Sequence, residues 1–333
     1  MVASWKELTP PNEKALREQV TEELGADHLR DLTQPALADS LTYIGVLWME
    51  TLLLVTAVNL LPHLPLGAAV VAGCVAVGLI GTRMNAFGVV VHEGSHGMLA
   101  RSRKLNDNLT NWTAAFWTLN SVEEYRPTHR LHHRYLGTQQ DPDRFFYLVP
   151  AKRGALAKLM LQDLLGFTAF RRATTRLAGT SQESGAAPSL LFKPRLLIGK
   201  VVTQLVVLGQ FVLFQGAVRG ILFYAVFWLV PIVCIYPMIL RLKTIVEHYD
   251  ARLHLPKMIN WTARTSVAGL VQNHLVGARM EYHFEHHVLP TIPYPGLKKV
   301  HRELDGRGLF DENGEYLSGG YVQFLARAVT RRL

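Results

Sequence analysis

Residues 64–96 carry the sequence LPLGAAVVAGCVAVGLIGTRMNAFGVVVHEGSH, in which a long apolar stretch ends in a pair of histidines. A helix of about 20 apolar residues crosses the roughly 30 Å hydrocarbon core of a bilayer, and the apolar part, about 64–91, exceeds that length. It therefore predicts a membrane-spanning helix. The polar residues Arg83 and Asn85 near its end indicate that the helix continues past the headgroups through His96. We expect His92 and His96 to stand just outside the bilayer.

Further stretches, at about 41–61, 199–218 and 221–240, are also long and apolar enough to span a membrane. Very short linkers join the spans in pairs, Pro62 with His63 and Arg219 with Gly220, and so predict two tight helical hairpins. The composition agrees, because 49% of the residues are hydrophobic and only 18% are charged. Pro231 and Pro237 are expected to kink the last span.

The charge distribution predicts which side of the membrane each segment occupies. Residues 92–198 hold fifteen Lys or Arg against eight Asp or Glu, so the positive-inside rule places them, residues 241–333 and the amino terminus in the cytosol. Residues 1–40 contain eight acidic and four basic residues and lack the pattern of a cleaved leader, so they predict a cytosolic or interfacial segment. The expected fold is an all-α integral membrane protein, with a single domain at 41–333. It has four transmembrane helices in two hairpins and a cytosolic helical cap, 92–198 and 241–333, that holds the functional site.

Several local features allow more than one interpretation. Residues 105–122 form either an amphipathic segment in the membrane interface or a buried helix of the cap. Glu50, in the middle of a span, either lines a substrate cavity or bonds a neighbouring helix. Residues 67–73 of the second span are rich in Gly and Ala, which either leaves room for a chain or serves close helix packing. Residues 180–189 are rich in Gly, Ser and Ala and predict a flexible connector.

The net charge of +9 does not indicate a nucleic-acid partner, because the sequence has no basic-aromatic stripe and no nucleic-acid motif. Anionic lipid headgroups are the expected partner instead. Cys74 and Cys234 lie within apolar stretches and are expected to be packing residues.

Nine of the fourteen histidines follow a pattern tied to the membrane boundaries. They form the groups HEGSH at 92–96, HRLHH at 129–133 and HFEHH at 283–287, together with His248, eight residues beyond the expected end of the last span. Within each group the spacing of three or four residues places the imidazoles on one side of a helix. Because one metal binds about four to six ligands, eight or nine imidazoles imply two metals. Imidazole suits iron, copper and zinc alike, so the ligands do not name the metal.

These boxes, in this order and after these spans, resemble the membrane fatty acid desaturase and hydroxylase superfamily. The similarity runs from about residue 41 to about residue 305. It includes Gly137-Thr138, Asp141-Pro142-Asp143, Glu247-His248, Arg264-Thr265, Asn273, Tyr282 and Leu289-Pro290.

The resemblance implies two irons, O2 as co-substrate and a set of nine histidine ligands. These are His92, His96, His129, His132, His133, His248, His283, His286 and His287. It also implies that other polar residues orient the histidines or water, namely Asp141, Asp143, Glu247 and Asn273. No haem-binding domain is apparent, so electrons are expected from a separate ferredoxin, or from cytochrome b5 with its reductase, drawn to a basic cytosolic face.

The activity that the resemblance implies is oxygen-dependent attack on C–H bonds of a lipid-like chain, foremost by a fatty acyl or lipid desaturase. A lipid hydroxylase, a carotenoid ketolase and a small-molecule tailoring oxygenase of the same superfamily remain open. His274 is either a tenth imidazole near the site or a surface or packing residue. His28, His63, His254 and His301 are expected to be ordinary surface or loop residues.

Rival functions account for fewer of these residues. The first box also fits the H-E-x-x-H motif of a zinc metalloprotease, and Leu304-Asp305-Gly306 resembles the third-ligand motif of intramembrane proteases, but charged residues flank that motif. A single zinc would also leave the other boxes unexplained. A ferritin-like di-iron protein needs two Glu-x-x-His pairs, and only Glu93 with His96 fits. A transporter would place its polar residues inside the membrane rather than beyond the spans.

Overall fold

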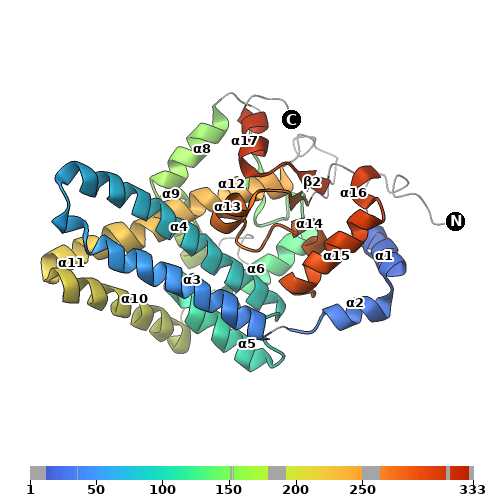
Figure 1. The fold of residues 1–333 in the computed structure, drawn as a ribbon, viewed down its shortest axis with the longest axis horizontal. Coiled ribbons are helices and arrows are strands. Elements are labelled where there is room, and N and C mark those ends of the chain that lie inside the picture. Colours follow the sequence, from blue (N-terminus) through green and yellow to red (C-terminus); the bar gives the residue numbers. More distant parts are fainter. Residues whose placement is uncertain are drawn as a thin grey trace.

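Figure 1 shows the computed structural model, which describes residues 13–35, 37–150, 152, 154–178, 193–249, 263–312 and 316–329. This part of the chain is mostly helical. Its strands, β1 (Thr265–Ser266) and β2 (Leu317–Ser318), form one short parallel pair in which Thr265 faces Leu317. The expected connector at 180–189 and His254 lie outside the described residues.

Among the described residues, four helical stretches are long and apolar enough to cross a membrane: Leu37–His63, Leu66–His96, Pro194–Gln215 and Ala217–His248. They contain the long helices α3 (Leu37–Val58), α4 (Leu66–His96) and α10 (Pro194–Gln215), and the fourth stretch begins with the shorter helix α11 (Ala217–Tyr224). These helices lie side by side in Figure 1, and the shorter helices gather at the other end of the molecule. Large apolar side chains such as Leu53, Val71 and Leu213 are exposed on their outer faces, as an integral membrane protein requires.

The helix α4 confirms the expected extension, because it runs without a break to His96. The turn between the last two spans differs from the expected one. It lies at Gly216, whose φ of 76° and ψ of 168° suit glycine, whereas Arg219 and Gly220 continue α11. A Cβ at Gly220 would meet the backbone of Val212 at 2.5 Å, so this glycine lets α10 and α11 approach closely.

The last stretch is interrupted at its prolines as expected, but by π-helical turns. It passes through the π-helical segments η6 (Ala225–Leu229) and η7 (Pro231–Ile235) before α12 (Tyr236–His248). Proline lacks the N–H of the helical hydrogen bond and clashes with the carbonyl four residues earlier, which widens the turn. Because α12 continues to His248, this histidine ends the helix itself instead of following it by eight residues.

The segment after the first box is amphipathic, with its polar residues turned inward. It comprises α5 (Arg103–Thr110), the π-helical η3 (Asn111–Ala115) and the 3-10 turn η4 (Phe116–Thr118). Asn106, Thr110 and Asn111 are buried, whereas Leu105 and Trp112 are exposed. Apolar side chains on the outside suit an interface with lipid better than an interior helix of a water-soluble cap.

The remaining helices are short and surround the ends of α4 and α12. They are α1 (Glu13–Leu24), α2 (Ala26–Leu32), η2 (Leu61–His63), α6 (Val122–Tyr135), α7 (Arg144–Tyr147), α8 (Ala155–Leu164), α9 (Phe167–Ala178), α13 (Leu270–Gln272), η9 (Asn273–Gly277), α14 (His283–Val288), α15 (Tyr294–Gly306), α16 (Leu309–Glu312) and α17 (Tyr321–Val329). The described part of the N-terminal segment shares a core with them. Leu16 and Val20 pack in the cluster that contains Phe284, and Arg17 Nε donates to the Val288 carbonyl at 2.8 Å.

Glu50 takes the second of its two expected roles, since it bonds neighbouring elements. It forms an ion pair with Arg83 of α4, and its other carboxylate oxygen lies 3.1 Å from His274 Nε2 of η9. Arg83 also donates to the His274 carbonyl at 3.0 Å. This polar cluster ties α3, α4 and η9 together.

Candidate metal centre

Four helices bring the nine predicted histidines together. The first pair comes from the last two turns of α4, the second box from α6, the third from α14, and His248 from the end of α12. Because residues i and i+4 share a helix face, each helix presents imidazoles toward the same space. The histidines fall into two neighbouring groups rather than one.

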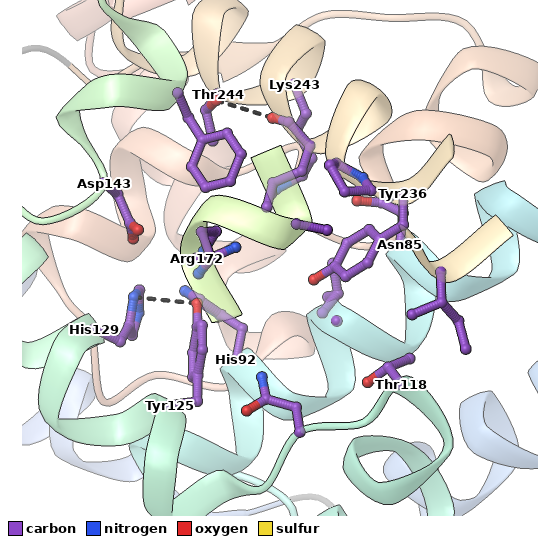
Figure 2. Close-up of a pocket in the computed structure, with 18 of the residues that line it drawn as sticks. Asn85, His92, Thr118, Tyr125, His129, Asp143, Arg172, Tyr236, Lys243 and Thr244 are labelled. Carbon is purple, nitrogen blue, oxygen red and sulfur yellow. Dashed lines mark hydrogen bonds between the residues drawn. The ribbon is translucent and has the colours of Figure 1, made fainter. Parts of the chain in front are cut away.

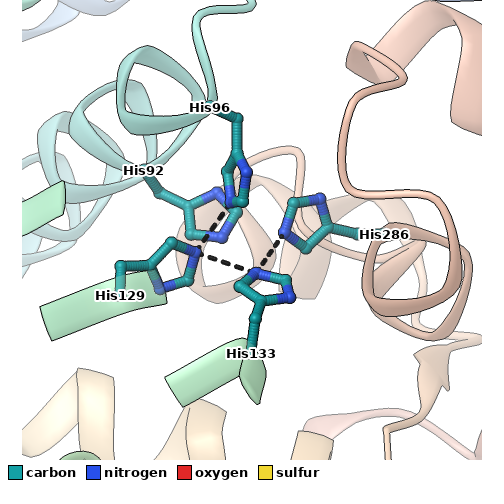
Figure 3. A group of neighbouring side chains, drawn as sticks. All are labelled: His92, His96, His129, His133 and His286. Carbon is teal, nitrogen blue, oxygen red and sulfur yellow. Dashed lines mark hydrogen bonds between the residues drawn. The ribbon is translucent and has the colours of Figure 1, made fainter. Parts of the chain in front are cut away.

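The first group contains five histidines whose nearest ring nitrogens all lie within 4.8 Å of one another (Figure 3). They are His92, His96, His129, His133 and His286. Their Nε2 atoms converge. His129 Nε2 lies 2.9 Å from His96 Nε2 and 3.0 Å from His133 Nε2, which in turn lies 3.1 Å from His286 Nε2.

The second group surrounds His248. His132 and His287 have ring nitrogens within 4.8 Å of it and of each other, and Glu247 with His283 forms an overlapping set. His283 Nε2 lies 2.8 Å from His248 Nε2 and 3.1 Å from His287 Nε2. The two groups are adjacent, because the rings of His133 and His287 have centroids 4.3 Å apart.

The nitrogen separations are compatible with ligands of one metal ion in each group. With metal–nitrogen bonds of about 2.1 Å, neighbouring ligands lie about 3.0–3.4 Å apart. The shortest contacts are 2.8–3.1 Å, and the other ring nitrogens of each group lie within 4.8 Å. Both ring nitrogens of His92 are buried without a hydrogen-bond partner, and a bound metal would provide a partner for one of them.

Three of the predicted ligands, His133, His283 and His286, are in the protonation state that binds metal. Burial lowers the pKa of His133, His283 and His286 well below the ordinary value, and neighbouring histidines lower it further. These imidazoles are therefore neutral near pH 7, and neutral imidazole is the ligand form.

A carboxylate, that of Asp141, contacts the second box. Asp141 Oδ1 lies 2.9 Å from His132 Nδ1, and the same carboxylate accepts a hydrogen bond from the Tyr147 hydroxyl. Although burial lowers the pKa of His132, Asp141 opposes this effect and raises the pKa to about 9. Asp143 donates its backbone N–H to Asp141 at 2.9 Å and lines the cavity described below.

A second buried carboxylate supports the third box, and the sequence did not reveal it. Glu285, which is fully buried, accepts a hydrogen bond from Thr265 and lies 2.5 Å from His301 Nδ1. His301 is therefore not the ordinary surface or loop residue that its place outside the boxes suggested. His301 lies in α15, sixteen residues after Glu285, and at this separation the sequence gives no local signal of the contact.

The other predicted supporting residues differ in their placement. Glu247 forms an ion pair with Lys243 at 3.0 Å and lies 3.7 Å from His283 Nε2. Asn273 donates to the Ala268 carbonyl at 3.2 Å. Among the described contacts, none joins Asn273 to a box histidine.

His274, His28 and His63, which lie outside the boxes, belong to neither group. His274 contacts Glu50 and Arg83, and neither of the two histidine groups includes it. His28 forms an exposed ion pair with Glu303, and His63 is exposed in the turn η2. Asp305, the third ligand that a zinc protease would need, is exposed on α15.

Close contacts hold the first box against its neighbours. Arg126 of α6 donates to the carbonyls of Ser95 and Gly94 at 2.9 and 3.2 Å and forms an ion pair with Asp107. A Cβ at Gly94 would lie 2.0 Å from Thr110 Oγ1, so only glycine allows α5 to pack here. These contacts fix the end of α4, from which His92 and His96 project.

A cavity of about 450 Å³ opens beside the two groups (Figure 2), and His92, His129 and His283 contribute to its lining. Tyr125, another lining residue, places its hydroxyl 3.3 Å from His129 Nδ1. Much of the remaining wall is apolar and comes from α7, α9, η7 and α12, with Phe146, Phe170, Ile232, Val233 and Leu240. The arrangement brings a ligand-sized, partly apolar space next to a pair of potential metal sites.

Sequence reasoning overlooked Tyr125, Tyr147 and Arg126. Tyr125 precedes His129 by four residues on the same helix, a spacing that places them on one face and gives a usable signal. Tyr147 and Arg126 act through contacts between elements, for which the sequence has no comparable signal.

Comparison with known proteins agrees with this site. A family model described as fatty acid desaturase matches residues 66–316 of the 333-residue chain. A curated relative, dihydrorhizobitoxine desaturase from Bradyrhizobium elkanii, is 27% identical over 241 residues, which cover 68% of this chain and 66% of the relative. The match therefore spans just under two thirds of that relative's length. With most of its length matched, including every histidine box, the chain belongs to the fatty acid desaturase family.

Proposed function

We propose that this chain is a di-iron, O2-dependent membrane desaturase that introduces a double bond into a lipid-like chain. The observation that supports this most directly is the convergence of nine imidazoles, in two adjacent groups, beside a cavity. Five nitrogens in the first group exceed the four ligands of a structural zinc site, and the second group offers four more imidazoles and Glu247. Two metal ions account for this donor set.

Iron suits the proposed chemistry because an unactivated C–H bond has no acidic proton and therefore requires an oxidant. With O2 and external electrons, a bound iron pair would supply that oxidising power. The chain's own residues supply the rest. The neutral imidazoles hold the metals, and Asp141 and Glu285 fix the orientation of the second and third boxes. The cavity walls would exclude water and hold the reacting chain in place.

The proposed topology is multi-pass, with both termini and the metal centre on the cytosolic side, since the basic segments flank the histidine boxes. A lipid or acyl chain would then enter from the bilayer. Electrons would come from a separate acidic carrier, ferredoxin or cytochrome b5 with its reductase, attracted by the basic face.

Desaturation is favoured over hydroxylation by the matched relative, which is named a desaturase. In both reactions one hydrogen leaves the substrate first. The outcome then depends on whether a second hydrogen is removed or oxygen is returned to carbon, so the position of the substrate in the cavity decides it. Residues that hold the substrate therefore matter as much as the ligands.

The test combines metal content with product analysis. The purified protein is analysed for metals, then supplied with a reductase, an electron carrier, O2 and membrane lipid, and the products are measured by mass spectrometry. We expect two equivalents of iron per chain and an O2-dependent product lighter by two hydrogen atoms. The variant His133→Ala should lose iron and product, whereas His63→Ala, at an exposed turn, should retain both.

Other results would redirect the proposal. A product heavier by one oxygen atom would make the chain a hydroxylase with the same metal centre. One zinc per chain, without any O2-dependent product, would reject the di-iron centre altogether.

A further inference from the structure

The cavity beside the histidines contains a positive charge that lacks an acidic partner among the residues that the structure describes. Its basic lining residues are Lys243 and Arg172. Lys243 Nζ lies 3.0 Å from Glu247 Oε1, so that charge is compensated. Among the described carboxylates, none forms an ion pair with Arg172.

Aromatic side chains fix the position of Arg172. It projects from α9 into the group of side chains that surrounds the cavity (Figure 2). Its guanidinium carbon lies 5.1 Å from the ring centroid of Phe146 and 5.9 Å from that of Phe145. Stacking on an aromatic face orients a guanidinium while leaving its N–H donors available.

Arg172 and Tyr125 both line the cavity, together with Asp143. The Tyr125 hydroxyl lies 3.3 Å from His129 Nδ1. Arg172 therefore faces the same space as a side chain that contacts a predicted ligand.

Two other guanidinium groups near the site, those of Arg126 and Arg241, are paired. Arg126 lies 2.5 Å from Asp107, and Arg241 lies 2.5 Å from Asp163. A partly desolvated charge without a counter-ion is costly, and a guanidinium binds carboxylate or phosphate through two parallel hydrogen bonds. A cavity lined by a guanidinium group that has no acidic partner among the described residues suits an anionic ligand.

We propose that Arg172 binds the anionic end of the substrate, which is therefore an amphiphile with a carboxylate or phosphate group rather than a neutral chain. This inference rests on the proposed function and narrows its substrate class. The apolar segment of the substrate lies against Phe146, Phe170 and Ile232, next to the histidines. A volume of about 450 Å³ falls in the lower half of the range of about 300–1,000 Å³ that holds drug-sized ligands.

The test measures binding of short probes to the full-length protein in lipid nanodiscs. Octanoate and octyl phosphate are compared with octan-1-ol by calorimetric titration, with empty nanodiscs to subtract partitioning into lipid. We expect both anions to bind the native protein more tightly than the alcohol. In Arg172→Gln their affinity should fall about 10- to 100-fold, as when a charge-assisted hydrogen bond is lost, while that of the alcohol stays unchanged.

Two further variants make the result specific. Arg172→Lys keeps the charge and should restore part of the anion affinity, although it lacks the two-pronged geometry. Arg171→Gln is the matched control, since Arg171 is the exposed neighbour on α9 and does not line the cavity. It should bind both anions like the native protein. Equal octanoate affinity in the native protein and in Arg172→Gln, or alcohol binding as tight as octanoate binding in the native protein, would overturn the proposal.

The source of the anion is resolved by repeating the titration in nanodiscs of zwitterionic lipid and of zwitterionic lipid mixed with anionic lipid. Weaker octanoate binding in the mixed nanodiscs would mean that a membrane lipid headgroup competes for Arg172. Equal binding would assign the site to a free anionic amphiphile. Because the titrations need no turnover, their failure is distinct from failure of the di-iron function, which metal analysis and product formation report separately.

Discussion

Asp141 is the side chain that most directly controls a predicted metal ligand. Its carboxylate lies 2.9 Å from His132 Nδ1, so it directs the Nε2 atom toward the second histidine group. We expect Asp141→Asn to weaken metal binding at that group by about 10- to 100-fold, the usual effect of losing a carboxylate behind a histidine ligand. Metal analysis after dialysis should show selective loss of one of two equivalents.

The control is Asp305→Asn, which changes an exposed carboxylate on α15 and should leave metal content intact. Loss of both equivalents in Asp141→Asn would show that the carboxylate supports the fold of the whole centre rather than one ligand. Full retention of both metal equivalents in Asp141→Asn would mean that the other contacts of His132 suffice to orient its ring.

His301 gives the third box a pH-dependent support. Burial alone would lower its pKa, but the hydrogen bond to Glu285 raises the pKa above the ordinary value. A histidine whose pKa is raised on folding contributes stability that is complete below its unfolded pKa of about 6.5 and is lost as pH rises through the folded value. We therefore expect the melting temperature of the metal-free protein to fall with rising pH across this interval.

The variant His301→Phe should remove this component of the pH dependence, whereas His28→Gln, in an exposed pair with Glu303, should not. Thermal unfolding in detergent at a series of pH values provides the measurement. An unchanged pH profile in His301→Phe would contradict the assignment.

At the scale of elements, the packing of α5 against the end of α4 depends on the glycine inside the first box. A Cβ at Gly94 would lie 2.0 Å from Thr110 Oγ1 and 2.8 Å from its Cβ, too close for either helix to stay in place. We expect Gly94→Ala to destabilise the protein by about 1–3 kcal/mol through overpacking, and to displace His92 and His96. Lower thermal stability and reduced metal content would both be measured.

The matched substitution is Gly78→Ala on the same helix, because no atom lies within 4 Å of the Cβ that it would introduce. Alanine favours a helix over glycine by about 1 kcal/mol, so this variant should be neutral or more stable. If the two variants had the same thermal stability and metal content, helix propensity, and not the contact with α5, would determine the role of Gly94.

The spacing of the histidines predicted that they come together, but not which of them belong to each of the two groups. In each three-histidine box the residues at i and i+4 join one group, His129 with His133 and His283 with His287, while the residue at i+3 joins the other. On a helix, i+4 lies about 40° from i and i+3 about 60° to the opposite side, so one box can face both metals. The partners from other helices depend on how α6 and α14 are rotated, which the sequence does not specify.

Across the whole molecule, hydropathy predicted all four spans but not their ends. The turn at Gly216 depends on a backbone conformation that an apolar average cannot detect, and the extension of α12 to His248 passes through charged residues that pair within the protein. Similarly, Glu285 and His301 are far apart in sequence and meet only after α14 and α15 pack. Patterns within one helix were therefore predictable, whereas contacts between helices were not.

The orientation of the molecule in the membrane is the prediction that belongs to this scale. The positive-inside rule places the histidine boxes on the cytosolic side and the turn at η2 on the opposite side. In a background with Cys74→Ser and Cys234→Ser, His63→Cys should react with a membrane-impermeant maleimide in intact cells. Arg307→Cys, beyond α15 on the proposed cytosolic side, should react only after the membrane is opened. The reverse pattern would place the metal centre outside the cytosol and deprive it of the proposed cytosolic electron carriers, so the reducing partner, rather than the iron ligands, would have to be reconsidered.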